Sequence, residues 1–360
     1  MFNERHYVPI LKWKRGEKVA LEALSDTTKQ LITPVIEIVP IPYDYANDCY
    51  DKTIEEHLQN IGDQIYTSWG NERPIFLDLY WIDDIITTAT GEHPLDYVLR
   101  LTRSRGLNII PVTGTNRNIQ YQHAIQRAIS NDRLGICLRL EDGDFININR
   151  STAQLLNEFH LEPENVDIII DFKSISPEVE NIISMSAIGL VNQLANINRW
   201  RSLTVSGSAF PGDLGQVEAN TVSNIPRTEW GIWNTLYSNR DRLNRMPTFG
   251  DYAVANPMYT EIDPRIMQMS ANIRYTCANE WMILKGVSVR RSGYDQYYNL
   301  SAELVRSPRY YGPTFSWGDQ YIFDCSERRC SCGNAETWRR VATNHHITVA
   351  ANQISNLFLT

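Results

Sequence analysis

Four short apolar segments of this chain each carry one charged residue near their downstream end. The segments cover residues 35–38, 76–79, 137–140 and 169–172. Their length, composition and flanking Pro, Gly or polar residues are typical of buried strands. The charged residues are Glu37, Asp78, Arg139 and Asp171. Because a buried charge costs free energy unless it is paired or hydrated, four of them predict a shared polar rim, which is where an α/β barrel carries its ligand site.

Strand-like and helix-like segments alternate through the first 254 residues. Strands are expected at residues 7–12, 32–39, 74–80, 108–112, 135–140, 166–172, 202–206 and 248–254, with helical patterns between them, one of which covers residues 50–69. This number of strands over about 250 residues is the size of a (β/α)8 barrel. The sequence therefore predicts an α/β fold with a TIM-like barrel at residues 1–254, and a doubly wound open sheet is the alternative.

The composition changes after residue 254 and becomes rich in Tyr, Trp, Gly, Pro and Arg. Strands are expected at residues 272–276, 281–289 and 320–325, and helices at 335–342 and 347–358. No Gly/Ser-rich linker separates this part from the barrel. We expect an α+β appendage at residues 255–360 that packs on the barrel, with C-terminal helices that complete it.

The net charge and the hydropathy of the sequence exclude several classes of protein. The net charge is −8, so the surface is not coated with basic residues, although a local basic patch remains possible. No run reaches the roughly 20 apolar residues that a membrane-spanning helix needs, and the N-terminus lacks an apolar signal region. Six cysteines are too few for a disulfide scaffold in 360 residues. We expect a cytoplasmic protein with reduced thiols and no membrane partner.

The rim residues suggest two interpretations. Mixed acids and bases at a barrel mouth can hold a polar ligand and shift each other's pKa values. In that case Glu37, Asp78 and Asp171 are the candidate catalytic acids, and the candidate ligand-binding residues are Lys12, Tyr80, Arg139 and Lys173. The alternative is an internal network of ion pairs that only fills the barrel.

A second candidate site follows the last two barrel strands. The segment SGSAFPG at residues 206–212 offers small hydroxyl and glycine residues whose backbone N–H groups can converge on an anion. Barrels often bind phosphate at these two loops. Ser206, Ser208, Asp251 and Tyr252 are therefore candidate anion-binding residues, and a tight turn is the alternative. The sequence contains no P-loop, no GxGxxG and no G-x-S-x-G elbow.

The spacing of the possible metal ligands does not match that of a known type of metal site. Cys325, Cys330 and Cys332, with His345 and His346 downstream, are ligand types that zinc prefers, but the C-x2-C spacing of a structural zinc site is missing. Ordinary reduced thiols are the alternative. Mg²⁺ held by the rim carboxylates also stays open. No cofactor is predicted.

The appendage combines arginines with aromatic rings. The candidate partner-binding residues are Arg290, Arg291, Tyr297, Tyr298, Arg309 and Tyr310. Such residues are enriched at protein–protein hot spots, and rings beside guanidinium groups also hold single-stranded nucleic acid. The third alternative is that the rings form the core of a small β layer.

Two segments near the N-terminus, YVPILKWKRGE at residues 7–17 and ITPVIEI at residues 32–38, resemble the Beta protein family. The similarity continues through SGSAFP at 206–211, GDY at 250–252 and the C-terminal pairs WR and HH at 338–339 and 345–346. The resemblance implies a component of a bacterial antiphage, toxin–antitoxin-like system that binds or regulates a toxic protein encoded beside it, or senses a phage product. It carries over no catalytic residues. The alternative function is a barrel enzyme that acts on a phosphorylated or nucleotide-like small molecule.

Overall fold

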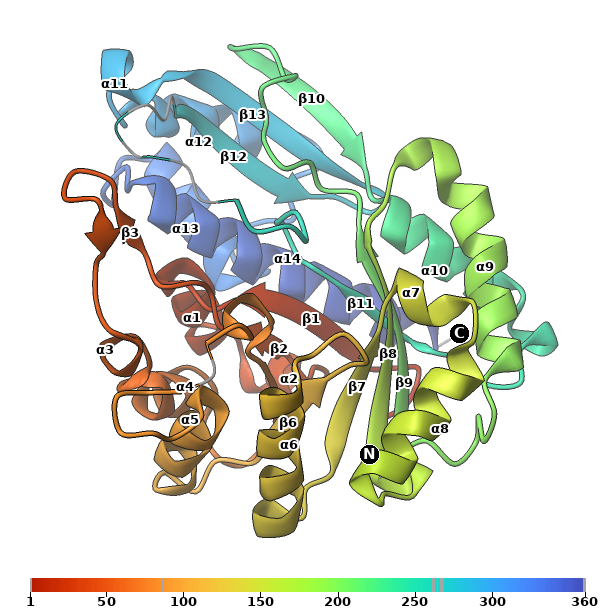
Figure 1. Cartoon of the computed structure of the whole chain (residues 1–360). Coiled ribbons are helices and arrows are strands. Elements are labelled where there is room, and N and C mark those ends of the chain that lie inside the picture. Colours follow the sequence, from red (N-terminus) through yellow and green to blue (C-terminus); the bar gives the residue numbers. More distant parts are fainter. Residues whose placement is uncertain (1, 86, 261–262, 264, 266–268, 359–360) are drawn as a thin grey trace.

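Eight parallel strands close into a barrel in the order β1-β11-β9-β8-β7-β6-β5-β2 (Figure 1). The computed structural model describes residues 2–85, 87–260, 263, 265 and 269–358. The barrel strands are β1 (Tyr7–Lys12), β2 (Val35–Glu37), β5 (Ile75–Asp78), β6 (Ile109–Thr113), β7 (Ile136–Leu140), β8 (Val166–Ser174), β9 (Ser202–Ser208) and β11 (Thr248–Asp251). The predicted (β/α)8 barrel is confirmed, and the doubly wound alternative is wrong because β1 pairs with both β2 and β11 and closes the sheet.

Helices surround the barrel strands, and most of them bury apolar side chains. They are α1 (Arg15–Glu22), α2 (Asp26–Gln30), α3 (Ile54–Leu58), α4 (Ile61–Trp69), α5 (Pro94–Arg103), α6 (Ile119–Asp132), α7 (Asp142–Phe145), α8 (Ile148–Phe159), α9 (Glu180–Gln193), α10 (Thr228–Ser238) and α14 (Ala335–Leu357). Short 3₁₀ turns lie at Tyr80–Ile82, Pro163–Asn165, Pro177–Val179 and Arg240–Arg242. Local signals set the limits of α6: the Asn118 side chain accepts a hydrogen bond from the Tyr121 N–H, and Arg133 ends the helix in the left-handed region.

A three-stranded antiparallel sheet stands beside the barrel, in the order β10-β13-β12. Its strands are β10 (Thr221–Pro226), β12 (Ser270–Thr276) and β13 (Glu280–Ser288), and α11 (Val289–Ser292), α12 (Gln296–Arg306) and α13 (Trp317–Ser326) complete this part of the chain. Strand β10 lies in the sequence between the barrel elements β9 and α10, but it pairs with β13 in the appendage sheet. The appendage sheet therefore includes a segment from within the barrel part of the chain. A separate hairpin, β3 (Tyr43–Asp44) with β4 (Cys49–Tyr50), follows β2.

Three sequence-based element predictions are wrong. Residues 320–325 belong to α13 and not to a strand, because Ser316 caps a helix there and Ile322 and Cys325 bury one helical face. The helices predicted at 335–342 and 347–358 are one continuous helix, α14, which the Asn334 capping box starts. The single helix expected over residues 50–69 is divided into α3 and α4.

Helix α14 joins the barrel to the appendage through two adjacent histidines. His346 Nε2 lies 2.8 Å from Asp251 Oδ2 on β11, whereas His345 Nδ1 lies 2.8 Å from Asp319 Oδ2 on α13. Both imidazoles are fully buried. Because each ring bonds a buried carboxylate of a different part of the fold, the helix fixes the position of the appendage relative to the barrel mouth.

The close packing of α13 on α14 predicts a sensitive glycine. A Cβ atom on Gly318 would lie 2.5 Å from the Val341 carbonyl oxygen, so we expect Gly318→Ala to lower the free energy of unfolding by about 1–3 kcal/mol through overpacking. Gly189 on α9 has no atom within 4 Å of the same position, and Gly189→Ala should raise it by about 0.5–1 kcal/mol. Chemical denaturation measures both. Equal effects of the two variants would contradict the packing described here.

The histidine that precedes β1 predicts a pH dependence. Burial lowers the pKa of His6 to about 4, and its ring stacks on Phe2 with centroids 4.4 Å apart. As pH falls from 6.5 toward 4, the unfolded chain takes up a proton at this ring and the folded chain does not, so the free energy of unfolding decreases. We expect His6→Gln to show a smaller decrease over this pH range, while His123→Gln, at an exposed position, follows the unmodified protein.

Candidate functional site at the barrel mouth

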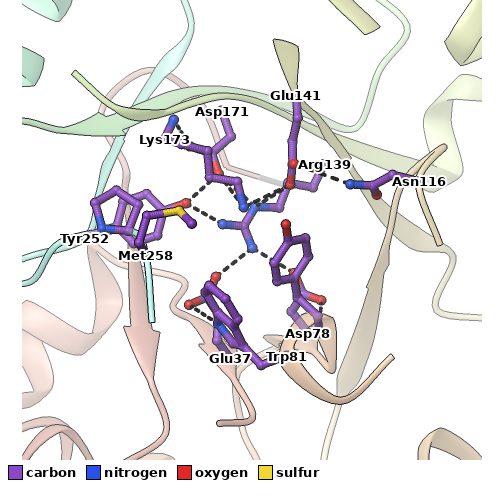
Figure 2. A network of polar contacts seen from close by, with 12 residues as sticks. Glu37, Asp78, Trp81, Asn116, Arg139, Glu141, Asp171, Lys173, Tyr252 and Met258 are labelled. Carbon is purple, nitrogen blue, oxygen red and sulfur yellow. Dashed lines mark hydrogen bonds and ion pairs between the residues drawn. The ribbon is translucent and has the colours of Figure 1, made fainter. Parts of the chain in front are cut away.

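Arg139, at the downstream end of β7, occupies the centre of the barrel mouth (Figure 2). Its Nη1 donates to Glu37 Oε1 and to Asp78 Oδ2, both at 2.8 Å. Its Nε donates to Asp171 Oδ2 at 2.8 Å, and its Nη2 donates to the Tyr252 hydroxyl. The four charged residues of the apolar segments therefore meet at one point, because they occupy equivalent positions near the downstream ends of parallel strands.

All six oxygens of the three carboxylates accept hydrogen bonds. Glu37 Oε2 accepts from Trp81 Nε1 at 3.2 Å. The second oxygen of Asp78 accepts from Arg117 Nη2 at 2.7 Å and from the backbone N–H of Tyr80. For Asp171, Oδ1 accepts from the Lys173 N–H at 2.9 Å, and Oδ2 also accepts from the Tyr252 hydroxyl at 2.5 Å. No carboxylate oxygen is left over to take a proton from a substrate.

The electrostatics of the mouth favour the ionised state of Asp78 and Asp171. Burial alone would raise the pKa of Asp78, but Arg117 and Arg139 outweigh it and leave that pKa below its ordinary value. Burial likewise opposes ionisation of Asp171, and Arg139 with Lys173 again lowers the pKa. Buried ion pairs of this kind keep their charges only while every partner is present.

A second layer of side chains covers the network. Lys173 Nζ lies 2.9 Å from Glu141 Oε1 and 4.2 Å from the centre of the Tyr80 ring. Figure 2 shows Asn116, Lys173, Tyr252 and Met258 around the arginine. Glu37, Asp78 and Asp171 are 0% exposed and Arg139 is 1% exposed. The ligand-binding and catalytic residues predicted for the rim are thus brought together, but they bond to one another.

Lys12 departs from this pattern. Its Nζ donates to the carbonyl oxygens of Asn256 at 2.7 Å and Pro257 at 2.9 Å, and lies 4.0 Å from Glu37 Oε2. Burial lowers the pKa of Lys12 to about 8, and Arg139 and Arg339 act in the same direction while Glu37 opposes them. This lysine lies at the edge of the mouth network and faces the appendage.

The predicted anion loop after β9 is a packed turn. Ser208 Oγ accepts from the Phe210 N–H at 3.1 Å and donates to the Ala255 carbonyl at 3.3 Å. A Cβ on Gly207 would lie 2.4 Å from Ile175 Cδ1, so this glycine allows close packing. Ser206 Oγ is buried and has no hydrogen-bond partner among the described residues. These groups face protein atoms, and the turn interpretation replaces the anion cradle.

Asp251, a second member of that predicted site, also bonds inside the protein. Its Oδ1 accepts from the Tyr7 hydroxyl at 2.5 Å, and its Oδ2 faces His346. Burial opposes ionisation of Asp251, but His346, Arg227 and the hydrogen bond from Tyr7 together outweigh it and lower the pKa of Asp251. The residue therefore fixes α14 on β11 and is not available to an anion.

The candidate partner-binding residues differ in exposure. Tyr297 is 2% exposed and stacks on Trp338 with centroids 4.5 Å apart, so its prediction as a partner contact is wrong. Tyr298, Arg309 and Tyr310 are half-buried, and Arg309 pairs with Glu280. The pair on α11 is exposed, namely Arg290 and Arg291.

The cysteines do not assemble a metal centre. Cys325 is buried, whereas Cys330 Sγ lies 3.4 Å from the Ser331 carbonyl and Cys332 Sγ lies 3.6 Å from Asp295 Oδ1. Among the residues that the structure describes, no three His, Cys, Asp or Glu side chains form a group suited to a metal ion. The donor sets proposed for Zn²⁺ and Mg²⁺ therefore do not fit, and at the mouth Arg139 takes the place that a cation would need.

Sequence reasoning missed Arg117 and Trp81. Both follow barrel strands, Trp81 in a 3₁₀ turn and Arg117 in a loop, whereas the prediction used only charges inside the apolar segments. Arg117 is 8% exposed and its guanidinium carbon lies 4.6 Å from the Tyr80 ring centre. The available signal in the sequence was that Arg117 comes three residues after Gly114, which directly follows strand β6.

Fold and mouth together define a (β/α)8 barrel protein whose polar centre is closed by a buried arginine. The chain belongs to the Beta protein family, whose model matches residues 7–352. No curated protein matches the sequence.

Two solved structures illustrate the structural similarity. Triosephosphate isomerase from Bartonella henselae has 11% identity and a TM-score of 0.37, with 69% of this chain and 94% of that chain covered. The biosynthetic arginine decarboxylase SpeA from Campylobacter jejuni has 10% identity and a TM-score of 0.40, with 98% of this chain and 56% of that chain covered.

None of the helices in the described part of the chain combines the length and the apolar character that crossing a bilayer requires.

The network predicts that its members act together in stability. Arg139→Met leaves three carboxylates buried without their cation, so we expect the free energy of unfolding to fall by about 3–5 kcal/mol. Asp78→Asn and Asp171→Asn should each cost a comparable amount, because each leaves a buried guanidinium under-compensated. Asp132→Asn breaks a solvent-facing pair with Arg103 and should cost less than about 1 kcal/mol. Denaturant titration measures all four, and near-neutral mouth variants would contradict a structural role.

Proposed function

We propose that this chain is a binding component of a bacterial antiphage defence system, which regulates a toxic partner protein and does not catalyse a reaction at its barrel mouth. The observation that carries the proposal is the closure of the mouth by Arg139. In a catalytic barrel the downstream ends of the strands hold groups that reach a substrate. Here the corresponding groups are buried and saturated.

General acid–base catalysis needs a group that can exchange a proton with a bound substrate at hydrogen-bond distance. Asp78 and Asp171 have depressed pKa values and no oxygen free of a protein donor. The alternative enzyme, in which these acids and Arg139 act on a phosphorylated ligand, would have to break the network first. The geometry of the barrel mouth therefore does not favour catalysis there.

The defence setting and the toxic partner come from the family resemblance, and the appendage supplies a surface for the partner. Arg290 and Arg291 are exposed on α11, which Figure 1 places at the tip of the appendage, away from the barrel. A groove with a volume of about 600 Å³ lies elsewhere on the appendage, and Arg309, Tyr310 and Tyr311 line it. Arginine and tyrosine side chains are the types that carry most binding energy at protein interfaces.

A purified neighbouring gene product tests the proposal. We expect it to form a complex with this chain in size-exclusion chromatography, and we expect deletion of the gene to change phage plating. Arg290→Glu and Arg291→Glu should each weaken the complex about tenfold or more, because each reverses a charge in the contact.

The matched control is Arg150→Glu, at an exposed position on α8, which should leave the complex unchanged. A monomer that ignores the neighbouring product, together with unchanged plating, would refute the proposed function. Equal weakening by Arg150→Glu would show a non-specific charge effect and would reject the α11 surface.

A further inference from the structure

A cleft separates the start of α1 from the appendage sheet and consists of two adjoining lobes. One has a volume of about 380 Å³ and reaches the first turns of α1 and α14. The other has a volume of about 570 Å³ and extends to the loop after β9 and to β13. The two lobes share a wall formed by Lys12, Lys14, Ala255, Met269, Asn272, Arg274 and Arg339. Volumes in this range are those of small-molecule sites.

The charge of this cleft opposes that of the chain. Its described lining has six basic residues and three acidic ones, whereas the whole sequence has a net charge of −8. The basic residues are Lys12, Lys14, Arg15, Arg274, Lys285 and Arg339. Such a local concentration of positive charge, enclosed by protein, attracts anions.

Two guanidinium groups in the shared wall lack a close carboxylate. Arg274 Nη1 and Arg339 Nη1 donate to the same acceptor, the Val254 carbonyl oxygen, at 2.9 and 2.8 Å. Arg274 Nε adds a bond to Asn272 Oδ1, and no ion pair of the described residues includes Arg274. Arg339 reaches Glu17 only at 3.9 Å. Burial and the neighbouring Arg339 lower the pKa of Arg274 well below its ordinary value, which expresses this uncompensated charge.

The backbone adds further donors at the same place. Helix α1 begins at Arg15, and the side chain of its N-cap residue Lys14 does not cap the first turn, which lines the smaller lobe and also carries Glu17. The N-terminal end of a helix also favours negative charge. Gly16 brings this end close to the guanidinium wall, because a Cβ there would lie 2.9 Å from Arg339 Cγ.

We propose that the cleft binds a phosphorylated small molecule, with its phosphate between Arg274, Arg339 and the first turn of α1. The organic part of the ligand would occupy the larger lobe, which Met258 and Met269 line. A phosphate offers several acceptor oxygens that two guanidinium groups can share, and its charge compensates both. This site is distinct from the closed barrel mouth and does not depend on the proposed partner.

The distinction from the mouth is physical. Arg139 lies 2.8 Å from each of three carboxylates. An anion at the mouth would therefore have to compete with these carboxylates for the arginine. The hydrogen bonds of Arg274 and Arg339 go to carbonyl and amide oxygens, which carry no net charge, and the carboxylate of Glu17 lies 3.9 Å from Arg339. An added phosphate therefore removes a repulsion in the cleft, whereas it would create one at the mouth.

Isothermal titration with ADP, pyrophosphate and adenosine tests the proposal on the full chain. We expect ADP and pyrophosphate to bind and adenosine not to bind, because adenosine has the organic part without the charge. Arg274→Gln and Arg339→Gln should each weaken ADP binding by about tenfold or more through the loss of a charge-assisted contact. Arg150→Gln, which removes the same charge on α8, should leave it unchanged.

A second variant keeps the test informative where the arginine variants do not fold. Ala335→Glu adds a carboxylate to the first turn of α14, where the helix dipole stabilises a negative charge, and it lines the smaller lobe. We expect this variant to fold and to lose ADP binding, because its carboxylate takes the place of the phosphate.

Absence of binding by both phosphorylated probes at millimolar concentration would overturn the proposal. So would equal binding of adenosine, or ADP binding that survives both Arg274→Gln and Ala335→Glu. Tighter binding of a single-stranded oligonucleotide than of ADP would assign the cleft to nucleic acid and reject the small-molecule class.

Discussion

The contact of Arg139 with Glu37, Asp78 and Asp171 is the interaction on which the barrel mouth depends. Removing one arginine and three carboxylates from water costs many kcal/mol. Their mutual attraction at 2.8 Å offsets that cost together with Arg117, Trp81 and the backbone donors around the carboxylates. The four groups come from four different strands, so their contact also requires the register of the closed barrel. A barrel with this centre is stable only when it is closed, and its strand ends are then unavailable for chemistry.

The closed mouth places binding elsewhere, and α14 determines where. This helix carries His346 against the barrel strand β11 and His345 against the appendage helix α13. It also brings Arg339 to the end of α1, next to Arg274 of the appendage sheet. The cleft is therefore built from three parts of the chain that α14 fixes relative to one another. Its shape depends on the same buried histidine contacts that hold the fold.

The sequence predicted the convergence of the four charged residues because strand geometry is periodic. Residues at equivalent positions of parallel strands must meet at one end of a barrel. It left open whether they hold a ligand or pair with one another, because the side-chain geometry by which Arg139 bonds its partners is not encoded in the spacing of the residues. Residues 320–325 show where the local pattern fails. Their apolar residues suited a strand, but the Ser316 cap and packing on α14 stabilise a helix instead. Tyr297 shows a third limit, since composition cannot separate a core ring from an interface ring.

Arginine has opposite roles at the two charged centres of this protein, and the number of nearby carboxylates decides which one. Arg139 has three within 2.8 Å and stabilises the fold. The pair formed by Arg274 and Arg339 shares one neutral carbonyl and has no carboxylate closer than 3.9 Å among its described ion pairs. Two like charges at one acceptor repel each other, and the fold retains that cost. An anion in the cleft would relieve the repulsion, so ligand binding there should stabilise the junction between barrel and appendage as well as fill it.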